Sequence, residues 1–233
     1  MTNNTIQIKI QQRLNKLASF DYDNIECWQI VEVFNKAQIE WCRRQLHGGN
    51  KYKEGDEMSK RRVDDLQILL QENLLTGNIE DRYFEATNFP NNYLEYKRVS
   101  TSANTECCPE SRTMTCYLAE EANVELILRD PLKRPDFEWG ETFCTLIGNN
   151  IRIYKRDFNI VEPVLTFYRK PRNIEILNCI DPYTGVITTV DVESEFKDDI
   201  VELIIDEAAS LIAGDINEAN QFYRGSEGAE RSN

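Results

Sequence analysis

The feature that most constrains the fold is a change in the spacing of apolar residues along the chain. Over residues 25–46, apolar side chains recur every three or four positions, which is the period of one helix face. From about Asp81 the spacing changes to the alternation typical of strands, and over residues 198–214 the helical period returns. The chain therefore predicts an α+β protein in which helical segments flank a β-rich middle.

Three helices are expected before the β-rich middle. They run over residues 5–19, 25–46 and from a cap at Ser59 through Leu70, and short or polar links join them. Each has an apolar face: Ile6, Ile10, Leu14 and Leu17 on the first, Cys27, Ile30, Val31, Phe34, Ala37 and Trp41 on the second, and Val63, Leu66, Leu69 and Leu70 on the third. This order predicts an antiparallel helical bundle.

The middle of the chain predicts a mostly antiparallel β domain of short strands. The candidates are residues 82–88, 93–100, 114–118, 124–129, 142–147, 151–154, 161–168, 174–180 and 186–192. The last two flank a turn that contains Pro182 and Gly185, which favours a hairpin. A helix over residues 198–214 then presents an apolar stripe that is expected to pack on the N-terminal bundle.

Four regions follow from these patterns. We expect a helical region at 1–80, a β-rich region at 81–193, a C-terminal helix that completes the bundle at 194–223 and a flexible tail at 224–233.

Composition restricts the possible partners and the compartment. The formal net charge of −13 argues against tight binding of DNA, because affinity for nucleic acid comes largely from Lys and Arg. No apolar run is long enough to span a bilayer, and no secretory signal opens the chain, so a cytoplasmic protein is expected. The seven cysteines form no paired spacing, which favours reduced thiols over a disulfide framework.

Few residues suggest catalysis or cofactor binding. His47 is the only histidine, and its place at a helix end explains it without chemistry. Cys107, Cys108 and Cys116 lack the spacing of a zinc site, and acidic pairs such as Asp198-Asp199 suit the first turn of a helix. No phosphate-binding glycine loop is present. We therefore expect no catalytic, metal or cofactor site.

Aromatic residues are the better candidates for function, as contacts to other proteins. Trp28 and Trp41 lie on or near the apolar stripe of the second helix, which favours a core or subunit contact. The proline-stiffened loop over residues 130–139 loses little entropy on docking, and it carries apolar side chains. Packing of this loop over its own sheet stays open as the alternative. The candidate interface residues are Trp28, Trp41, Pro131, Pro135, Phe137, Trp139, Phe222 and Tyr223.

The order of motifs in the second half resembles the ring proteins that connect portal to tail in short-tailed bacteriophages, above all the crAss-like group. The matching motifs are Asp130-Pro131-Leu132-Lys133-Arg134-Pro135, the strand Ile151–Tyr154, Tyr168-Arg169-Lys170-Pro171 and the helix Glu195–Ala213. The resemblance implies a virion structural protein with no enzymatic activity, made in the host cytoplasm, that assembles into a twelve-fold ring. Its implied partners are further copies of itself, the portal and other tail ring proteins. Genomic DNA would pass through the ring without specific binding, and an acidic wall suits such passage.

Two other functions stay open at this point. One is a small intracellular hydrolase that uses a carboxylate pair, and the other is a monomeric adaptor that binds one protein partner.

Overall fold

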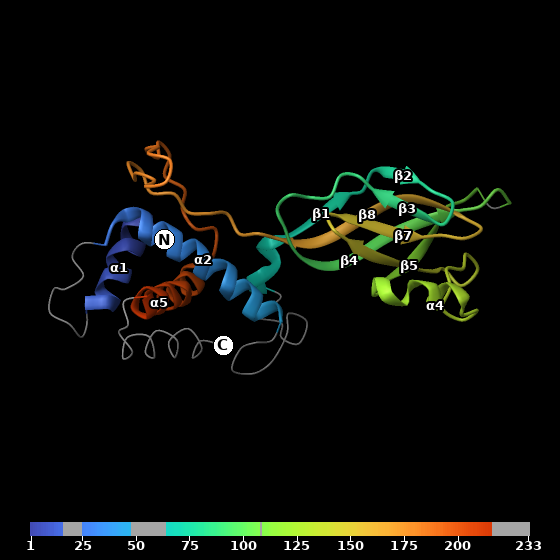
Figure 1. The fold of residues 1–233 in the computed structure, drawn as a ribbon, viewed down its shortest axis with the longest axis horizontal. Helices are drawn as coiled ribbons and strands as arrows, with labels where there is room; N and C mark the ends of the chain where they lie inside the picture. The colour runs from blue at the N-terminus through green and yellow to red at the C-terminus, as the bar shows by residue number, and fades with distance from the viewer. Residues whose placement is uncertain (16–24, 48–63, 108, 216–233) are drawn as a thin grey trace. The chain divides into compact units, whose positions relative to one another are not determined.

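The chain folds into two compact units (Figure 1). The computed structural model describes residues 1–15, 25–47, 64–107 and 109–215. One unit, here the helical unit, combines Met1–Ile68 with Pro171–Asn233, and the other, the sheet unit, is Leu69–Lys170. The expected α+β class is confirmed, because the chain contains both long helices and a large β-sheet.

Three helices form the core of the helical unit. They are α1 (Asn3–Asn15), α2 (Cys27–Leu46) and α5 (Asp198–Asp215), and α5 packs against both α1 and α2. The apolar stripes meet in the interior, where the fully buried side chains include Ile6, Ile10, Leu14, Ile30, Phe34, Ile200 and Ile204. The C-terminal helix therefore packs on the N-terminal helices, as its stripe predicts.

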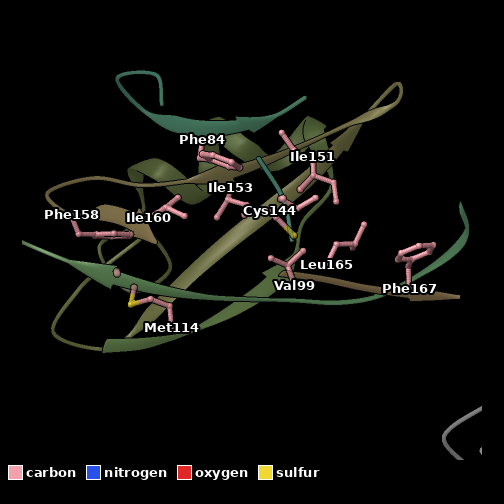
Figure 2. Packing of buried hydrophobic residues seen from close by; sticks show 13 residues of the cluster. Phe84, Val99, Met114, Cys144, Ile151, Ile153, Phe158, Ile160, Leu165 and Phe167 are labelled. Carbon is pink, nitrogen blue, oxygen red and sulfur yellow. The ribbon is translucent and has the colours of Figure 1, made fainter. Parts of the chain in front are cut away.

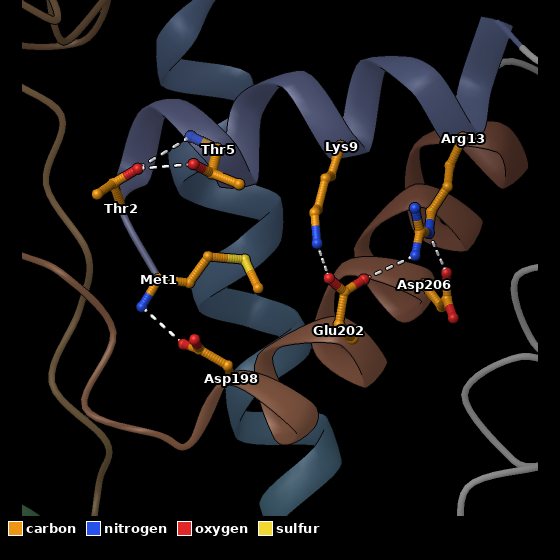
Figure 3. A network of polar contacts seen from close by, with 8 residues as sticks. All are labelled: Met1, Thr2, Thr5, Lys9, Arg13, Asp198, Glu202 and Asp206. Carbon is orange, nitrogen blue, oxygen red and sulfur yellow. Dashed lines mark hydrogen bonds and ion pairs between the residues drawn. The ribbon is translucent and has the colours of Figure 1, made fainter.

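Charged side chains join α1 to α5 along one side of this core (Figure 3). Lys9 and Arg13 of α1 both contact Glu202 of α5, with Arg13 Nη2 at 2.8 Å from the carboxylate, and Arg13 also contacts Asp206. Because these side chains are half-buried and share partners, the network aligns the two helices more firmly than an isolated surface pair.

Within the described residues, the expected third helix ends earlier than the sequence predicts. Residues 64–66 are helical and lead into a 3₁₀ turn, η1 (Gln67–Leu69), but Leu70 begins strand β1 (Leu70–Leu74). The prediction that Leu70 lies inward on a helix is therefore wrong, and its side chain is exposed. Pairing of β1 with β8 outweighs the helical spacing here. Leu17, Ser59 and Val63 lie outside the described residues.

Eight strands form one sheet in the order β1-β8-β4-β5-β6-β7-β3-β2. Besides β1 they are β2 (Gly77–Ile79), β3 (Tyr83–Ala86), β4 (Tyr93–Asn104), β5 (Arg112–Leu118), β6 (Glu141–Ile147), β7 (Asn150–Tyr154) and β8 (Asn159–Arg169). Every pairing is antiparallel except that of β5 with β6. Because only Leu75 and Thr76 separate β1 from β2, the two ends of the strand order approach each other and the sheet curves into a half-barrel.

The concave side of the sheet encloses the core of this unit (Figure 2). Its buried side chains include Phe84, Val99, Met114, Cys144, Ile151, Ile153, Phe158, Ile160, Leu165 and Phe167. A smaller cluster of Val124, Phe143 and Tyr154 packs beside it, and the rings of Phe143 and Tyr154 stack at 4.5 Å.

Residues 124–129 form a helix, α4 (Val124–Arg129), where the sequence predicts a strand. The reason is topological. The parallel pairing of β5 and β6 needs a crossover connection, which a two-residue hairpin cannot supply. The 3₁₀ turn η2 (Glu121–Asn123) and α4 provide that crossover, and Val124 buries its side chain against Phe143.

The expected hairpin at 174–192 is not part of the sheet. It belongs to the helical unit and has only two isolated bridges, Glu175 with Val192 and Ile180 with Ile187. The turn between its two sides is present, with Gly185 at a φ of +67°. The compact units accordingly divide at residues 69 and 171, whereas the sequence patterns place the changes at 81 and 194.

A glycine in β2 provides a test of the sheet register. A Cβ on Gly77 would lie 1.9 Å from the carbonyl oxygen of Glu85 and 2.8 Å from Cα of Ala86, so β2 and β3 would have to separate. We expect Gly77→Ala to lower the free energy of unfolding by about 3 kcal/mol, measured by urea denaturation.

Gly148→Ala is the matched control for this prediction. Gly148 has a φ of +58° but open space around it, so only the cost of a left-handed residue, about 1 kcal/mol, is expected. Equal losses in the two variants would contradict the close approach of β2 to β3.

Candidate protein-docking site

An unusual surface among the described residues of the helical unit is the segment of residues 173–193, here called the arm, which appears in orange in Figure 1 and precedes α5 in the chain. Six large apolar side chains on it are at least half exposed: Leu177, Ile180, Tyr183, Val186, Ile187 and Val190. Tyr183 is 80% exposed and Val186 is 62% exposed. Isolated exposed apolar residues are ordinary, but six within fourteen residues form a contiguous stretch typical of an interaction site.

The two sides of the arm are fixed at their base by two asparagines, of which Asn3 is buried and Asn35 is half-buried. Asn3, at the start of α1, donates from Nδ2 to the backbone oxygens of Glu175 and Val192 and to the carboxylate of Asp191, at 2.9–3.0 Å. Asn35 of α2 accepts from the N–H of Ile174 at 2.8 Å and donates to its carbonyl. The arm therefore leaves the helices at a defined place, because side-chain amides bind its backbone on both sides.

A disulfide fixes the middle of the arm. Cys179 is bonded to Cys27 at the N-terminus of α2, with 5.8 Å between their Cα atoms. The expectation that all cysteines are reduced thiols is therefore wrong for this pair, because the fold brings together two cysteines separated by 152 positions in sequence. Next to the bond, the ring of Trp28 meets that of Tyr183 edge to face at 6.2 Å.

The turn at the end of the arm is held by its own side chains. Asp181 accepts a hydrogen bond from the N–H of Tyr183 at 2.9 Å and another from the hydroxyl of Thr184 at 2.7 Å. The Thr184 hydrogen bond, followed by that from Tyr183, lowers the pKa of Asp181 from its ordinary value. Asp181 is the only charged residue between Ile176 and Val190, so the end of the arm is almost wholly uncharged.

A groove runs between the arm and α2. It encloses about 620 Å³. Trp28 and Val31 of α2 line one wall, and Tyr183, Val186 and Ile187 of the arm line the other. The arm is thus supported from one side while its apolar side chains remain accessible.

A depression with both apolar and charged lining residues lies on the sheet unit, beside α4. It encloses about 720 Å³, and four exposed apolar side chains line it: Tyr117, Leu118, Leu126 and Leu132. The hydroxyl of Tyr117 donates to the carbonyl of Lys133 at 2.7 Å and so ties β5 to the loop after α4. Carboxylates of Glu120, Asp130 and Glu141 and the ammonium of Lys133 also line the depression.

The structure disperses the candidate interface residues. Trp41 is buried, with its ring edge to face with Phe196 at 5.5 Å, and Trp28 is half-buried beside the arm. In the loop after α4, Pro135 is buried and Phe137 packs against the sheet core, whereas Pro131 and Trp139 are exposed. Phe222 and Tyr223 lie outside the described residues. Of the predicted set, Trp28 contacts the arm, and Pro131 lies beside Leu132 of the depression.

Reasoning from sequence missed the arm as a site because its strand propensity favoured a place in the sheet. One signal separates it from a half-buried strand. Strands of that kind alternate polar and apolar residues, but here Val186 and Ile187 are consecutive and almost no charge is present.

The groups considered for chemistry do not converge on a reactive centre. His47 is exposed at the end of α2, where its N–H bonds to the carbonyl of Arg43. Asp198 pairs with the N-terminal amine at 2.8 Å. Among the described residues, no three His, Cys, Asp or Glu side chains are placed to hold a metal ion.

Of the two neighbouring thiols of the sheet unit, Cys116 is unsuited to act as a nucleophile. Cys116 and Cys144 lie on the neighbouring strands β5 and β6, and the hydroxyl of Tyr96 is 3.6 Å from Cys144 Sγ. Hydrogen bonding to Cys144 and burial raise the pKa of Cys116. The reactive thiolate is therefore disfavoured at Cys116.

Comparisons with known proteins assign no function to these surfaces. Neither protein-family models nor curated proteins give a match to this chain. Within the described part of the chain, no helix combines the length and apolar character that crossing a bilayer requires.

The Cys27–Cys179 disulfide is expected to stabilise the folded protein. Reduction, or the Cys27→Ser substitution, is expected to lower the free energy of unfolding by about 2–4 kcal/mol, because the bond closes a long loop in the unfolded chain. Urea denaturation with and without reductant measures this change.

Cys107→Ser is the matched control, since Cys107 is an exposed free thiol and its removal should leave the urea midpoint unchanged. Alkylation of Cys27 and Cys179 in the unreduced folded protein, seen by mass spectrometry, would show that the bond is absent.

Proposed function

We propose that this protein is a non-enzymatic structural subunit of a bacteriophage virion. In this proposal it forms a homo-oligomeric ring, twelve-fold by resemblance, that joins the portal to the tail and surrounds the DNA channel. The observation that carries the assembly role is the arm, whose six apolar side chains are held out to solvent by Asn3, Asn35 and the Cys27–Cys179 bond.

Exposure of the apolar side chains of the arm to water is unfavourable, and their burial in an assembly would offset this. Burying apolar surface stabilises a complex by roughly 25 cal/mol per Å², so several aliphatic side chains and one tyrosine can supply an interface centre. The arm is anchored before binding, which reduces the conformational entropy lost on docking. A surface that is both apolar and anchored supports binding to other protein subunits.

The identification as a phage ring protein rests on the sequence resemblance, and the charge of the chain is consistent with it. A net charge of −13 disfavours adhesion to DNA phosphates, which is what a wall of a DNA channel requires. The partners in this proposal are further copies, the portal and the adjacent tail ring proteins, with no membrane and no cofactor.

The disulfide is compatible with a virion location. Disulfides are rare in a reducing cytoplasm and persist in oxidising surroundings. A virion protein experiences both, first during assembly in the host and then after release. We infer that Cys27 and Cys179 become bonded in released particles.

The alternatives have less support. A carboxylate-based hydrolase needs two acids whose environments split their pKa values. Asp198 is instead largely exposed and paired with the N-terminal amine. A monomeric adaptor would use the arm for one partner and would leave the depression on the sheet unit uncovered.

Imaging of the particle tests the ring directly. We expect density for this chain in a closed ring below the portal, and a native mass of the complex with purified portal that corresponds to many copies per portal. One copy per portal would favour the adaptor, and virions that lack the chain would exclude the structural role.

Substitution of the acid and histidine candidates tests the enzyme alternative. Alanine at His47, Asp198 and Asp199 together should leave phage infectivity nearly unchanged, because His47 is exposed and the ion pair of Asp198 is at the surface. The melting temperature of the variant is the control for folding. A large loss of infectivity in a stably folded variant would support catalysis.

A further inference from the structure

We propose that the arm of one copy docks into the depression on the sheet unit of the next copy, against its exposed leucines. This inference rests on the proposed ring and names the contact that builds it. It assigns one role to two surfaces of the described residues, the arm on the helical unit and the depression beside α4 on the sheet unit.

The apolar part of the depression suits the arm in size and character. The depression encloses about 720 Å³, within the range of pockets that bury several side chains or a small ligand. Leu118, Leu126 and Leu132 line it and are 45–69% exposed. The arm offers aliphatic side chains of the complementary kind, such as Val186 and Ile187, on a narrow two-sided projection.

One pair of opposite charges, Lys133 and Asp181, is available to the contact. The lining of the depression includes one cation, Lys133, and the end of the arm carries one charge, Asp181. The other charged groups of the lining are carboxylates, which accept hydrogen bonds. The hydroxyl of Tyr183 is a neutral donor on the most exposed side chain of the arm, so it can approach them without adding a like charge.

Backbone N–H and C=O groups of the arm can also take part in the contact. Ile180 and Ile187 face each other as a pair that does not exchange hydrogen bonds, since the bonds run between Asp181 and Val186 and between Thr188 and Cys179. The backbone groups of Ile180 and Ile187 therefore point outward, where an adjoining chain can pair with them.

A second copy explains the surface better than a membrane does. No Lys or Arg lies between Asn173 and Glu193, and acids flank the apolar residues, so an anionic lipid surface would repel the arm. The contact joins two different surfaces of identical chains, so each bound copy still offers a free arm and a free depression. Such a heterologous contact repeats, and it closes into a ring when the rotation between copies permits.

Two double substitutions test the arm and the depression separately. The arm variant carries Val186→Asp and Ile187→Asp, and the depression variant carries Leu126→Asp and Leu132→Asp. All four side chains are more than half exposed, so both variants are expected to fold. Ile8→Asp and Ile79→Asp, on exposed apolar residues outside these surfaces, are the matched controls for the helical and the sheet unit.

Self-association of the full-length protein is then measured by sedimentation velocity, up to the highest concentration at which it stays dissolved. Each variant alone should lose at least tenfold in self-association, whereas the controls should retain it. A mixture of the two variants should form a 1:1 complex and nothing larger, because only one intact arm–depression contact remains. Self-association that survives both pairs, or a mixture with no complex, would overturn the proposal.

Carbodiimide crosslinking of a mixture of ¹⁵N-labelled and unlabelled unmodified protein shows which chains are in contact. We expect Asp181 crosslinked to Lys133 in mixed-isotope peptides. Crosslinks only within one chain, or none between these residues, would refute the contact between copies.

The same crosslinking on purified virions separates this inference from the proposed function. A ring without the Asp181–Lys133 crosslink would reject the arm contact and leave the ring intact. The crosslink in virions without a ring below the portal would reject the ring and keep the contact.

Discussion

The anchoring of the arm is the constraint on which the functional interpretation of this protein depends. An apolar segment without support would collapse onto the nearest apolar surface, because that is where water is excluded. Asn3 and Asn35 prevent this at the base by binding the arm backbone, and Cys27 prevents it further along by its bond to Cys179. The fixed base of the arm would also reduce the conformational entropy that is lost when the arm docks on a partner.

The helical unit can provide these anchors because it is assembled from both ends of the chain. Its α1 and α2 precede the sheet unit, while the arm and α5 follow it. The disulfide and the ion pairs of α1 with α5 therefore join residues more than 150 positions apart. Closing such long loops is entropically costly, and the apolar contacts of the three helices offset that cost.

The sequence predicts the elements whose pattern is local and misses those that depend on distant partners. The stripes of α2 and α5 are periodic, so both helices are expected where they occur. In α4, by contrast, six apolar-rich residues fit a strand equally well, and only the parallel pairing of β5 with β6 decides for a helix. The disulfide cannot be predicted from a local pattern, because its two cysteines are 152 positions apart in sequence. The depression also depends on the fold, because its lining includes residues of β5, α4 and the loop after α4.

In the proposed virion role, the disulfide and the amide anchors would act under different redox conditions. The hydrogen bonds of Asn3 and Asn35 do not depend on redox conditions, so the base of the arm is defined in the reducing cytoplasm where assembly would begin. The Cys27–Cys179 bond can then form once oxidising conditions are met, without moving the base. Oxidation would then add a constraint in the middle of the arm to the hold of Asn3 and Asn35 at its base, so a contact made reversibly during assembly would become long-lived.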